Sequence, residues 1–284
     1  MKKTFFLNFL FVSLFFTSSC KKEKAETPVE TPVSNQTPDK SLGGIMYDKF
    51  WAKEAKFDQN NADIAKFNAA ADFFRCKQCH GWDGLGNTGS YINRAPSKTR
   101  PNVTGLNLYQ LVQSKTSDEL YTAMKKTAGR RSISYDLSTY DPLTNATEGD
   151  KMPDYTQILT DAQIKDLVEF LKKGLSDVSQ LYDGTYTGTY PTGKAIYTNI
   201  GKDGNAANGN AYFASKCSSC HGVDGKQILV ENMTIGAFTR AKPYEVHHKV
   251  QYGQLGSTML GQFSMTTAQM KDLYKALSDT TKYP

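Results

Sequence analysis

Two short segments of this chain carry the same pattern of cysteine and histidine. Residues 76–80 and residues 217–221 both read Cys-x-x-Cys-His, and both continue as Gly-x-Asp-Gly. This pattern attaches haem covalently, because two thiols on one helical turn can both reach the vinyl groups while the histidine that follows faces the iron. A redox dithiol or half of a zinc site also uses two cysteines at this spacing. The histidine that directly follows the pair in both copies favours haem.

We therefore expect two covalently bound haem c groups, each with its iron. The attachment residues are Cys76, Cys79, Cys217 and Cys220, and the first iron ligands are His80 and His221. The chain has 5 cysteines, so Cys20 alone stands outside the two motifs. An exported protein normally uses cysteines for disulfides, and this distribution leaves none for that purpose.

A haem motif needs helices to position it, and the sequence predicts two around each motif. Residues 159–167 and 265–273 match in type at nearly every position, and each copy opens with Thr-x-x-Gln, a capping box at a helix start. The apolar residues that follow recur at helical spacing. Further helices are expected over residues 63–74 and 206–215, before the two motifs. Each unit is thus predicted to end in an amphipathic helix.

The N-terminus is typical of an exported protein. Residues 1–19 begin with Met-Lys-Lys and continue with a short apolar stretch, which predicts a signal peptide. The stretch ends in Thr-Ser-Ser before Cys20, which resembles the lipobox of bacterial lipoproteins, and in that family this cysteine is acylated. Plain cleavage to a soluble periplasmic protein is the alternative. Residues 20–42 are expected to form the lipidated Cys20 and a disordered tether that spans on the order of 25 Å.

Composition bounds what else the chain can be. Its 284 residues suggest two domains, and a mean hydropathy of −0.52 excludes a protein with many membrane spans. Residues 1–19 hold two of the 34 basic residues and none of the 28 acidic ones, so the remaining chain is too evenly charged to indicate a nucleic-acid partner. Hydrophobic residues make up only 39%, so we expect the flat apolar cofactor to supply part of each core.

Together these features resemble the class I c-type cytochromes, the cytochrome c family, in a tandem two-haem form. The resemblance extends over residues 45–284 and rests on the haem motifs, the Gly-x-Asp-Gly continuation, a methionine loop and the capped closing helix. It implies an all-α fold with cytochrome c domains at residues 43–178 and 196–284. Residues 179–195 alternate turn residues with Thr and Tyr, so an ordered strap or short β-hairpin is expected between the domains.

In that family the sixth iron ligand is a methionine shortly before the last helix. Met152 and Met259 stand at the matching places, so the resemblance implies them as axial ligands. Met233 is an alternative at the second site, which lacks the Met-Pro pair of the first. The pair His247-His248 could instead supply a ligand or a distal acid, whereas surface or haem-edge packing is its ordinary role. The other candidate methionines are expected to be core residues. They are Met124, Met265 and Met270.

The same resemblance suggests further contacts to haem. The segment at Pro101 resembles the one whose proline carbonyl accepts the Nδ1–H of the ligand histidine, and the second half has no matching proline. Trp82, Arg130 and Arg131 are candidates to hold haem propionates, with solvated or packing roles as the alternative. Residues 128–150 form an insertion that is expected to be a loop. Shielding of a haem edge and a docking surface are two roles for this loop, and a surface insertion that is simply tolerated is the third.

An iron with histidine on one side and methionine on the other has no free position for a substrate, and methionine raises its reduction potential. The resemblance therefore implies an electron carrier rather than an enzyme, in the periplasm or at a cell surface. Its expected partners are other redox proteins and, through the N-terminal lipid anchor, a bacterial membrane. A haem enzyme, such as a diheme peroxidase or a thiosulfate dehydrogenase-like oxidoreductase, is the alternative.

Overall fold

The computed structural model describes residues 37–144 and 148–284. The predicted signal peptide, Cys20 and most of the predicted tether lie outside the described residues. By its contacts, the stretch Gln36–Pro284 forms one compact unit. None of the helices in the two described ranges is long and apolar enough to cross a membrane.

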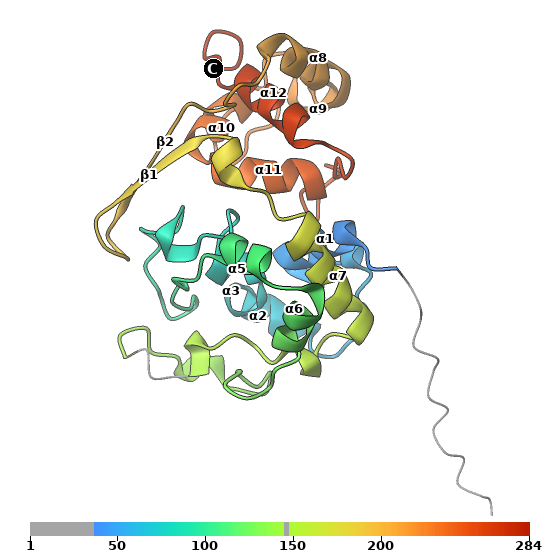
Figure 1. The fold of residues 1–284 in the computed structure, drawn as a ribbon, viewed down its shortest axis with the longest axis vertical. Helices are drawn as coiled ribbons and strands as arrows, with labels where there is room; N and C mark the ends of the chain where they lie inside the picture. The colour runs from blue at the N-terminus through green and yellow to red at the C-terminus, as the bar shows by residue number, and fades with distance from the viewer. Residues whose placement is uncertain (1–36, 145–147) are drawn as a thin grey trace, which may run out of the picture. The chain divides into compact units, whose positions relative to one another are not determined.

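Helices joined by irregular loops dominate the described part of the chain (Figure 1). The α-helices are α1 (Lys40–Lys49), α2 (Ile64–Ala69), α3 (Ala71–Phe74), α4 (Cys76–His80), α5 (Leu108–Ser114), α6 (Ser117–Met124), α7 (Asp161–Lys173), α8 (Ala206–Lys216), α9 (Ser218–His221), α10 (Ile235–Ala241), α11 (Pro243–Tyr252) and α12 (Thr267–Leu277). Short 3-10 helices lie at Lys53–Ala55, Gly86–Thr88, Leu137–Thr139, Glu148–Asp150, Tyr155–Gln157 and Val178–Gln180. Strands β1 (Asp183–Thr187) and β2 (Lys194–Thr198) pair as an antiparallel hairpin. The predicted helical fold with a short hairpin is thus observed.

Two main hydrophobic cores organise these elements. The buried residues of the first core come from Ile45 through Leu175, together with Tyr252. Those of the second core come from Val178 through Tyr283. We refer to residues 37–175 as the first half and to residues 178–284 as the second half. Both cores lie within the one compact unit.

Each half is built on a pair of packed helices, α1 with α7 and α8 with α12. A glycine at the fourth position of α1 and of α8 permits the close approach. A Cβ at Gly43 would lie 2.0 Å from the backbone oxygen of Asp166, and a Cβ at Gly209 would lie 1.9 Å from that of Asp272. Both distances are far below van der Waals contact, so only glycine fits at either position.

The same two aspartates also tie the helix pairs at their ends. The backbone N–H of Asp39, the N-cap of α1, donates to the Asp166 carboxylate at 2.7 Å. The backbone N–H of Asn205, the N-cap of α8, donates to the Asp272 carboxylate at 2.6 Å. The two halves therefore repeat one arrangement of glycine, N-cap and aspartate.

The two closing helices begin as the sequence predicts. In α7 the Thr160 side chain accepts from the Gln163 N–H while the Gln163 side chain bonds back, which completes a capping box. Thr266 and Gln269 form the same box at the start of α12. Each box satisfies backbone N–H groups that a helix start otherwise leaves unpaired.

Helix α1 is not predicted from the sequence. It begins at Lys40, so the tether predicted for residues 20–42 is too long at its C-terminal end. The helix expected over residues 63–74 is two short helices, α2 and α3, which meet at Ala70. By its packing, α1 rather than this segment corresponds to α8. Gly43 and Gly44 weaken the local helical signal of α1, and packing on α7 stabilises it.

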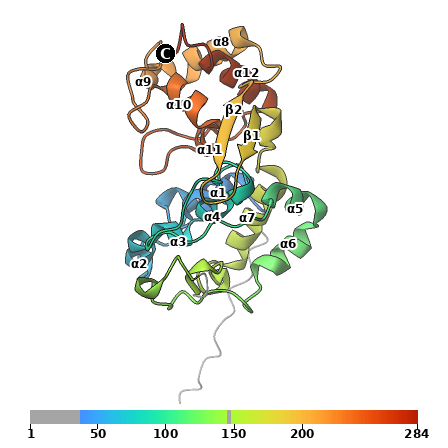
Figure 2. The ribbon, with the colours of Figure 1, turned by 90° about the vertical axis from the view of Figure 1, so that its left-hand side faces the viewer.

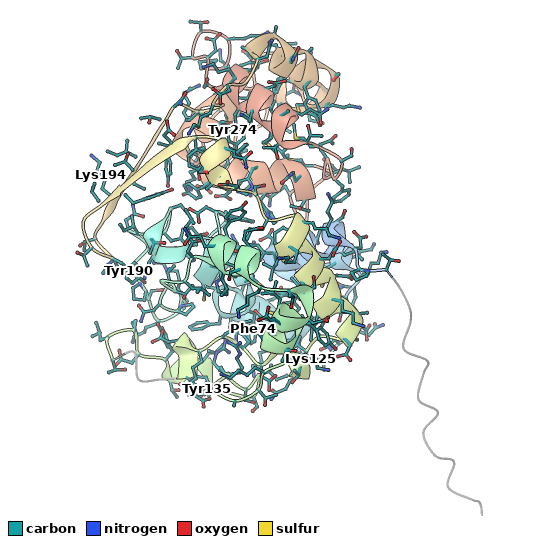
Figure 3. The ribbon with its side chains drawn as sticks, in the orientation of Figure 1. Phe74, Lys125, Tyr135, Tyr190, Lys194 and Tyr274 are labelled. Atoms are coloured by element: carbon teal, nitrogen blue, oxygen red, sulfur yellow. The ribbon has the colours of Figure 1, made fainter. Side chains whose placement is uncertain are left out.

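The hairpin reaches from the second half back to the first (Figure 2). At its turn, the Tyr190 hydroxyl accepts the backbone N–H of Val103 at 3.1 Å and lies 3.3 Å from the side-chain oxygen of Asn102 (Figure 3). A Cβ at Gly193 would meet the side chain of Ile92 at 2.4 Å, so the turn lies against the first half. The expected strap is thus an ordered hairpin, and β2 extends three residues beyond the predicted boundary at 195.

Candidate functional site

The first Cys-x-x-Cys-His segment forms helix α4, which consists of the motif alone. Gly81 ends the helix with a φ of 78°, a conformation that favours glycine. Burial raises the pKa of Cys76 to about 11 and that of Cys79 to about 12, so both thiols are protonated at neutral pH. A redox-active thiol instead has a lowered pKa. The environment therefore disfavours a redox dithiol and suits covalent attachment.

Among the described residues, no further ligands support the zinc alternative. The four motif cysteines are free of disulfides. Within residues 37–144 and 148–284, no three His, Cys, Asp or Glu side chains come together as a metal site. Because a zinc site takes three or four such ligands, the described residues do not complete one around either motif.

His80 is held in the neutral form that an iron ligand requires. Burial lowers its pKa to about 4, and nearby Arg130 acts in the same direction. Its Nδ1 is buried and has no hydrogen-bond partner. The bond predicted to the carbonyl of Pro101 is therefore not made. The segment is tied to the motif through Thr104 instead, whose N–H donates to the carbonyl of Cys79 at 3.2 Å.

Met152 lies beside a buried arginine. The Arg131 N–H donates to the carbonyl of Met152 at 2.9 Å, and the Arg131 carbonyl accepts from Asp154 at 2.8 Å. The Arg131 residue is 1% exposed, and its Nη2 donates to the carbonyl of Phe73 at 2.9 Å. Its Nε and Nη1 are buried without a partner. A buried cation with unpaired N–H groups requires an anion, so Arg131 fits a haem propionate.

The other two propionate candidates are engaged elsewhere. Arg130 donates to the carbonyl of Ala123 at 3.0 Å. Trp82 is 2% exposed, and its ring centre lies 4.7 Å from that of His248. Arg130 and Trp82 therefore have the packing or surface roles that are the alternative to propionate binding.

Tyr155 belongs to the first site, although the sequence alone does not predict this. Its hydroxyl lies 3.7 Å from the Cys76 sulfur and donates to the carbonyl of Phe74 at 3.2 Å. The residue is buried. Only its place three residues after Met152 could have indicated this contact. Tyr155 thus fixes the first attachment cysteine from the side of the methionine loop.

The insertion at residues 128–150 is an irregular loop in its described part, as predicted. Short 3-10 helices are its regular elements there. Tyr140 anchors it, because its ring packs edge-on against Phe73 at 5.1 Å and its hydroxyl donates to Asp150 at 2.7 Å. The loop therefore covers the helix that precedes the first motif.

The second motif repeats the local geometry of the first. Helix α9 carries Cys220 and His221, and Cys217 directly precedes it. Burial raises the pKa of Cys217 to about 11. Burial also lowers the pKa of His221, while the backbone of Ile228 acts in the opposite direction. Like that of His80, the Nδ1 of His221 is buried without a partner, and Gly222 ends the helix with a φ of 77°.

Apolar side chains near the second motif and in the Met259 loop are open to solvent. Ile228, whose backbone lies near His221, is 46% exposed, and Leu260 and Phe263 are 78% and 43% exposed. Large apolar side chains with such exposure suit a cover by another apolar group. A flat apolar cofactor attached to Cys217 and Cys220 fits this requirement, so the second site, like the first, suits haem.

The methionines divide as expected between loops and cores. Met265 and Met270 are buried in the second core, and Met124 packs on the first. Met259 and the alternative Met233 are both partly buried against the second core. Packing therefore does not distinguish between the two as ligands at the second site.

His247 and His248 are buried between the halves and are not a surface pair. Each is 2% exposed, on helix α11. The His248 ring lies 4.7 Å from Trp82 and 5.9 Å from Tyr47, which belong to the first half. Burial lowers the pKa of His247 to about 4 and that of His248 to about 3, so both are neutral. Both ring nitrogens of His247 and Nε2 of His248 lack partners.

Comparison with protein families matches residues 62–174 to the model for Cytochrome c. The matched stretch runs from α2 through α7 and includes the first motif and Met152. It supports a c-type cytochrome with covalently bound haem and a haem-based role in electron transfer. Comparisons with curated proteins and with solved structures gave no match.

Proposed function

Since residues 62–174 contain a cytochrome c domain, we propose that the protein is a diheme c-type cytochrome that transfers electrons between redox partners. The proposal adds a second haem domain, in the second half, to the one that the family match supports. Other redox proteins are its donors and acceptors.

The observation that carries the proposal is the repeated geometry of the two halves. Both motif helices end at a glycine in the left-handed region, with φ of 78° and 77°. Both motif histidines keep a buried, unpartnered Nδ1. Both halves close on a helix pair that requires glycine at Gly43 or Gly209. One function for both motifs accounts for this repetition.

The chain's own residues would bind each haem and hold it in place. When bound, haem supplies a reversible one-electron change at its iron. Cys76 and Cys79 would hold the first group and Cys217 and Cys220 the second, with His80 and His221 as neutral iron ligands. Met152 and Met259 would fill the sixth positions and leave no place for a substrate. Arg131 would neutralise a propionate of the first haem.

The proposed location is the outer side of a bacterial membrane. Export is proposed from residues 1–19 and anchoring from acylation of Cys20. Mass spectrometry of the mature protein tests both, since an acylated N-terminal Cys20 is expected. A mature N-terminus without lipid would leave the electron-transfer proposal intact and would remove the anchor.

An optical spectrum of the oxidised protein tests the iron ligands. Two equivalents of the iron–methionine charge-transfer band are expected for the unaltered chain. Met152→Ala and Met259→Ala should each remove one equivalent, and Met233→Ala is the matched control that should keep both. If Met233→Ala removes a band and Met259→Ala does not, the assignment at the second site is wrong.

The same samples discriminate a carrier from a haem enzyme. Cyanide and peroxide should leave the spectrum unchanged while the protein is folded, because both irons are saturated. Binding of either at a haem without denaturation would contradict the carrier and favour the peroxidase-like alternative. Haem content measured per chain should be two, and a value of one would overturn the second haem domain.

A further inference from the structure

The loop at residues 253–262 carries Met259, the proposed sixth ligand of the second haem, and follows directly on helix α11. Two backbone hydrogen bonds close this loop. The N–H of Gln254 donates to the carbonyl of Met259 at 3.1 Å, and the N–H of Gln262 donates to that of Val250 at 2.8 Å. The place of Met259 therefore depends on how the C-terminal end of α11 is held.

Tyr252, the last residue of α11, is buried in the first core although its helix belongs to the second half. Helix α11 lies against α1 of the first half (Figure 1 and Figure 2). The Tyr252 hydroxyl donates to the carbonyl of Gly174 at 3.1 Å. Its ring centre lies 5.3 Å from that of Phe170 on α7. The ring thus contacts the first half at both α1 and α7.

Two glycines of the first half make room for Tyr252. A Cβ at Gly44 would lie 2.3 Å from its ring, and a Cβ at Gly174 would lie 2.6 Å from its hydroxyl. Both distances are far below van der Waals contact, so a methyl group at either position would displace the tyrosine. We refer to the space between these two glycines as the tyrosine slot.

The loop itself starts on the first half and ends on the second. Leu255 packs against the first core, and the N–H of Gly256 donates to the carboxylate of Glu54 at 3.4 Å. Met259 packs against the second core. The loop therefore bridges the two halves.

The other proposed methionine ligand is held within its own half. The carbonyl of Met152 accepts the N–H of Arg131 at 2.9 Å. Tyr155, three residues further along, is buried in the first core. Met152 and Met259 thus differ in the half that supports them.

We propose that the first half positions the sixth ligand of the second haem and that Tyr252 is the positioning residue through which it does so. Met259 and the second haem are taken from the proposed function, on which this inference rests. A ligand on a loop stays on its metal only while the residues around it hold it in place. Loss of Tyr252 from the tyrosine slot therefore releases Met259 and leaves Met152 bound. Because methionine raises the reduction potential, the potential of the second haem depends on contact between the halves.

The iron–methionine charge-transfer band of the oxidised, haem-loaded full chain tests this role. Tyr252→Leu should lose one of the two equivalents and bind one cyanide per chain, because one iron then lacks its sixth ligand. Phe57→Leu is the matched control, because Phe57 is also an aromatic residue of the first core and both residues are 6% exposed. The control should keep both equivalents and bind no cyanide. Tyr252→Phe keeps the ring and should also keep both equivalents.

A substitution in the first half gives a second measurement. Gly44→Ala places a methyl group where the Tyr252 ring lies, and alanine favours a helix more than glycine does, so α1 itself is kept. This variant should lose the same equivalent as Tyr252→Leu. Gly105→Ala is its control and should lose none, because its Cβ would meet only the side chain of Asn87.

Combination with the ligand variants identifies the haem that is affected. Met259→Ala together with Gly44→Ala should keep one equivalent, because both changes act on the same iron. Met152→Ala together with Gly44→Ala should keep none. The reverse pattern would place the effect at the first haem and would refute the positioning of Met259.

Retention of both equivalents in Gly44→Ala would overturn the positioning role and leave the proposed function intact, even where Tyr252→Leu does not fold. Equal loss in Phe57→Leu would also overturn it, because general loosening of the first core would then explain the effect. Fewer than two equivalents in the unaltered chain would instead contradict the proposed ligands, and the positioning role would fall with them.

Discussion

Replacement of Gly43 or Gly209 by alanine tests whether the two halves are built alike. Each glycine is the fourth residue of its helix, and each lies against the backbone oxygen of an aspartate on the partner helix. The new Cβ atoms would stand 2.0 Å and 1.9 Å from these oxygens. A backbone oxygen cannot rotate away, so each helix pair must separate.

The cost follows from two opposing effects. Overpacking of a tight contact costs about 1–3 kcal/mol, and alanine in place of glycine within a helix returns about 1 kcal/mol. Because a backbone oxygen cannot give way, the upper end of the overpacking range applies, about 3 kcal/mol, and the free energy of unfolding should fall by about 2 kcal/mol in each variant. Gly105→Ala is the control, because its Cβ would meet only the side chain of Asn87, at 3.3 Å or more, and no backbone atom.

Urea unfolding of the haem-loaded protein, followed by circular dichroism, measures these changes. The haem absorbance of each half should report which half loosens first. If Gly209→Ala is as stable as Gly105→Ala while Gly43→Ala is not, the second half does not share the architecture of the first. If neither is destabilised, the close crossing itself is wrong.

Three more tests concern the pH dependence of stability at His247, the buried Arg131 and the capping box at Thr266. His247 has a pKa of about 4 in the folded protein, against an ordinary value of 6.5. Between these pH values the unfolded chain binds more protons than the folded protein, so the free energy of unfolding falls as the pH falls from 6.5 to about 4. The loss is roughly 3 kcal/mol at most, and urea titrations at several pH values should show a flatter acid limb for His247→Phe; an unaltered limb would contradict the assignment. Arg131→Met should lower the potential of one haem in a spectroelectrochemical titration, because a neighbouring cation favours the reduced iron, and Arg131→Lys should restore part of it; two unchanged steps would exclude the propionate contact. Thr266→Ala should lower the free energy of unfolding by about 1 kcal/mol in urea titrations through loss of the cap, and a loss equal to that of exposed Ser264→Ala would refute this role.

The features that could be predicted from the sequence are those determined by patterns of neighbouring residues. The capping boxes at Thr160 and Thr266 and the helix predicted at residues 206–215 follow from patterns a few residues long, and the structure contains all three. The motif helices likewise follow from spacing alone. These elements need no information about distant parts of the chain.

The missed features depend on contacts between distant residues. Helix α1 is stabilised by α7, which lies more than a hundred positions away in the chain. Its own glycines, Gly43 and Gly44, weaken the local signal that would predict a helix. The burial of His248 depends on Trp82 and Tyr47, and the unpaired nitrogens of Arg131 become apparent only when Phe73 and Met152 surround it. No spacing rule gives these pairings, since each needs the whole fold.

The contact between Trp82 and His248 also sets an order of events during biosynthesis. The two residues are 166 positions apart in the chain. A ribosome that adds roughly 5–20 residues per second needs about 8–30 s to make that length. During this interval the first haem motif has been made, whereas helix α11, which covers Trp82 in the finished protein, has not. While that helix is missing, the loop that carries Trp82 is more accessible than it is in the finished protein.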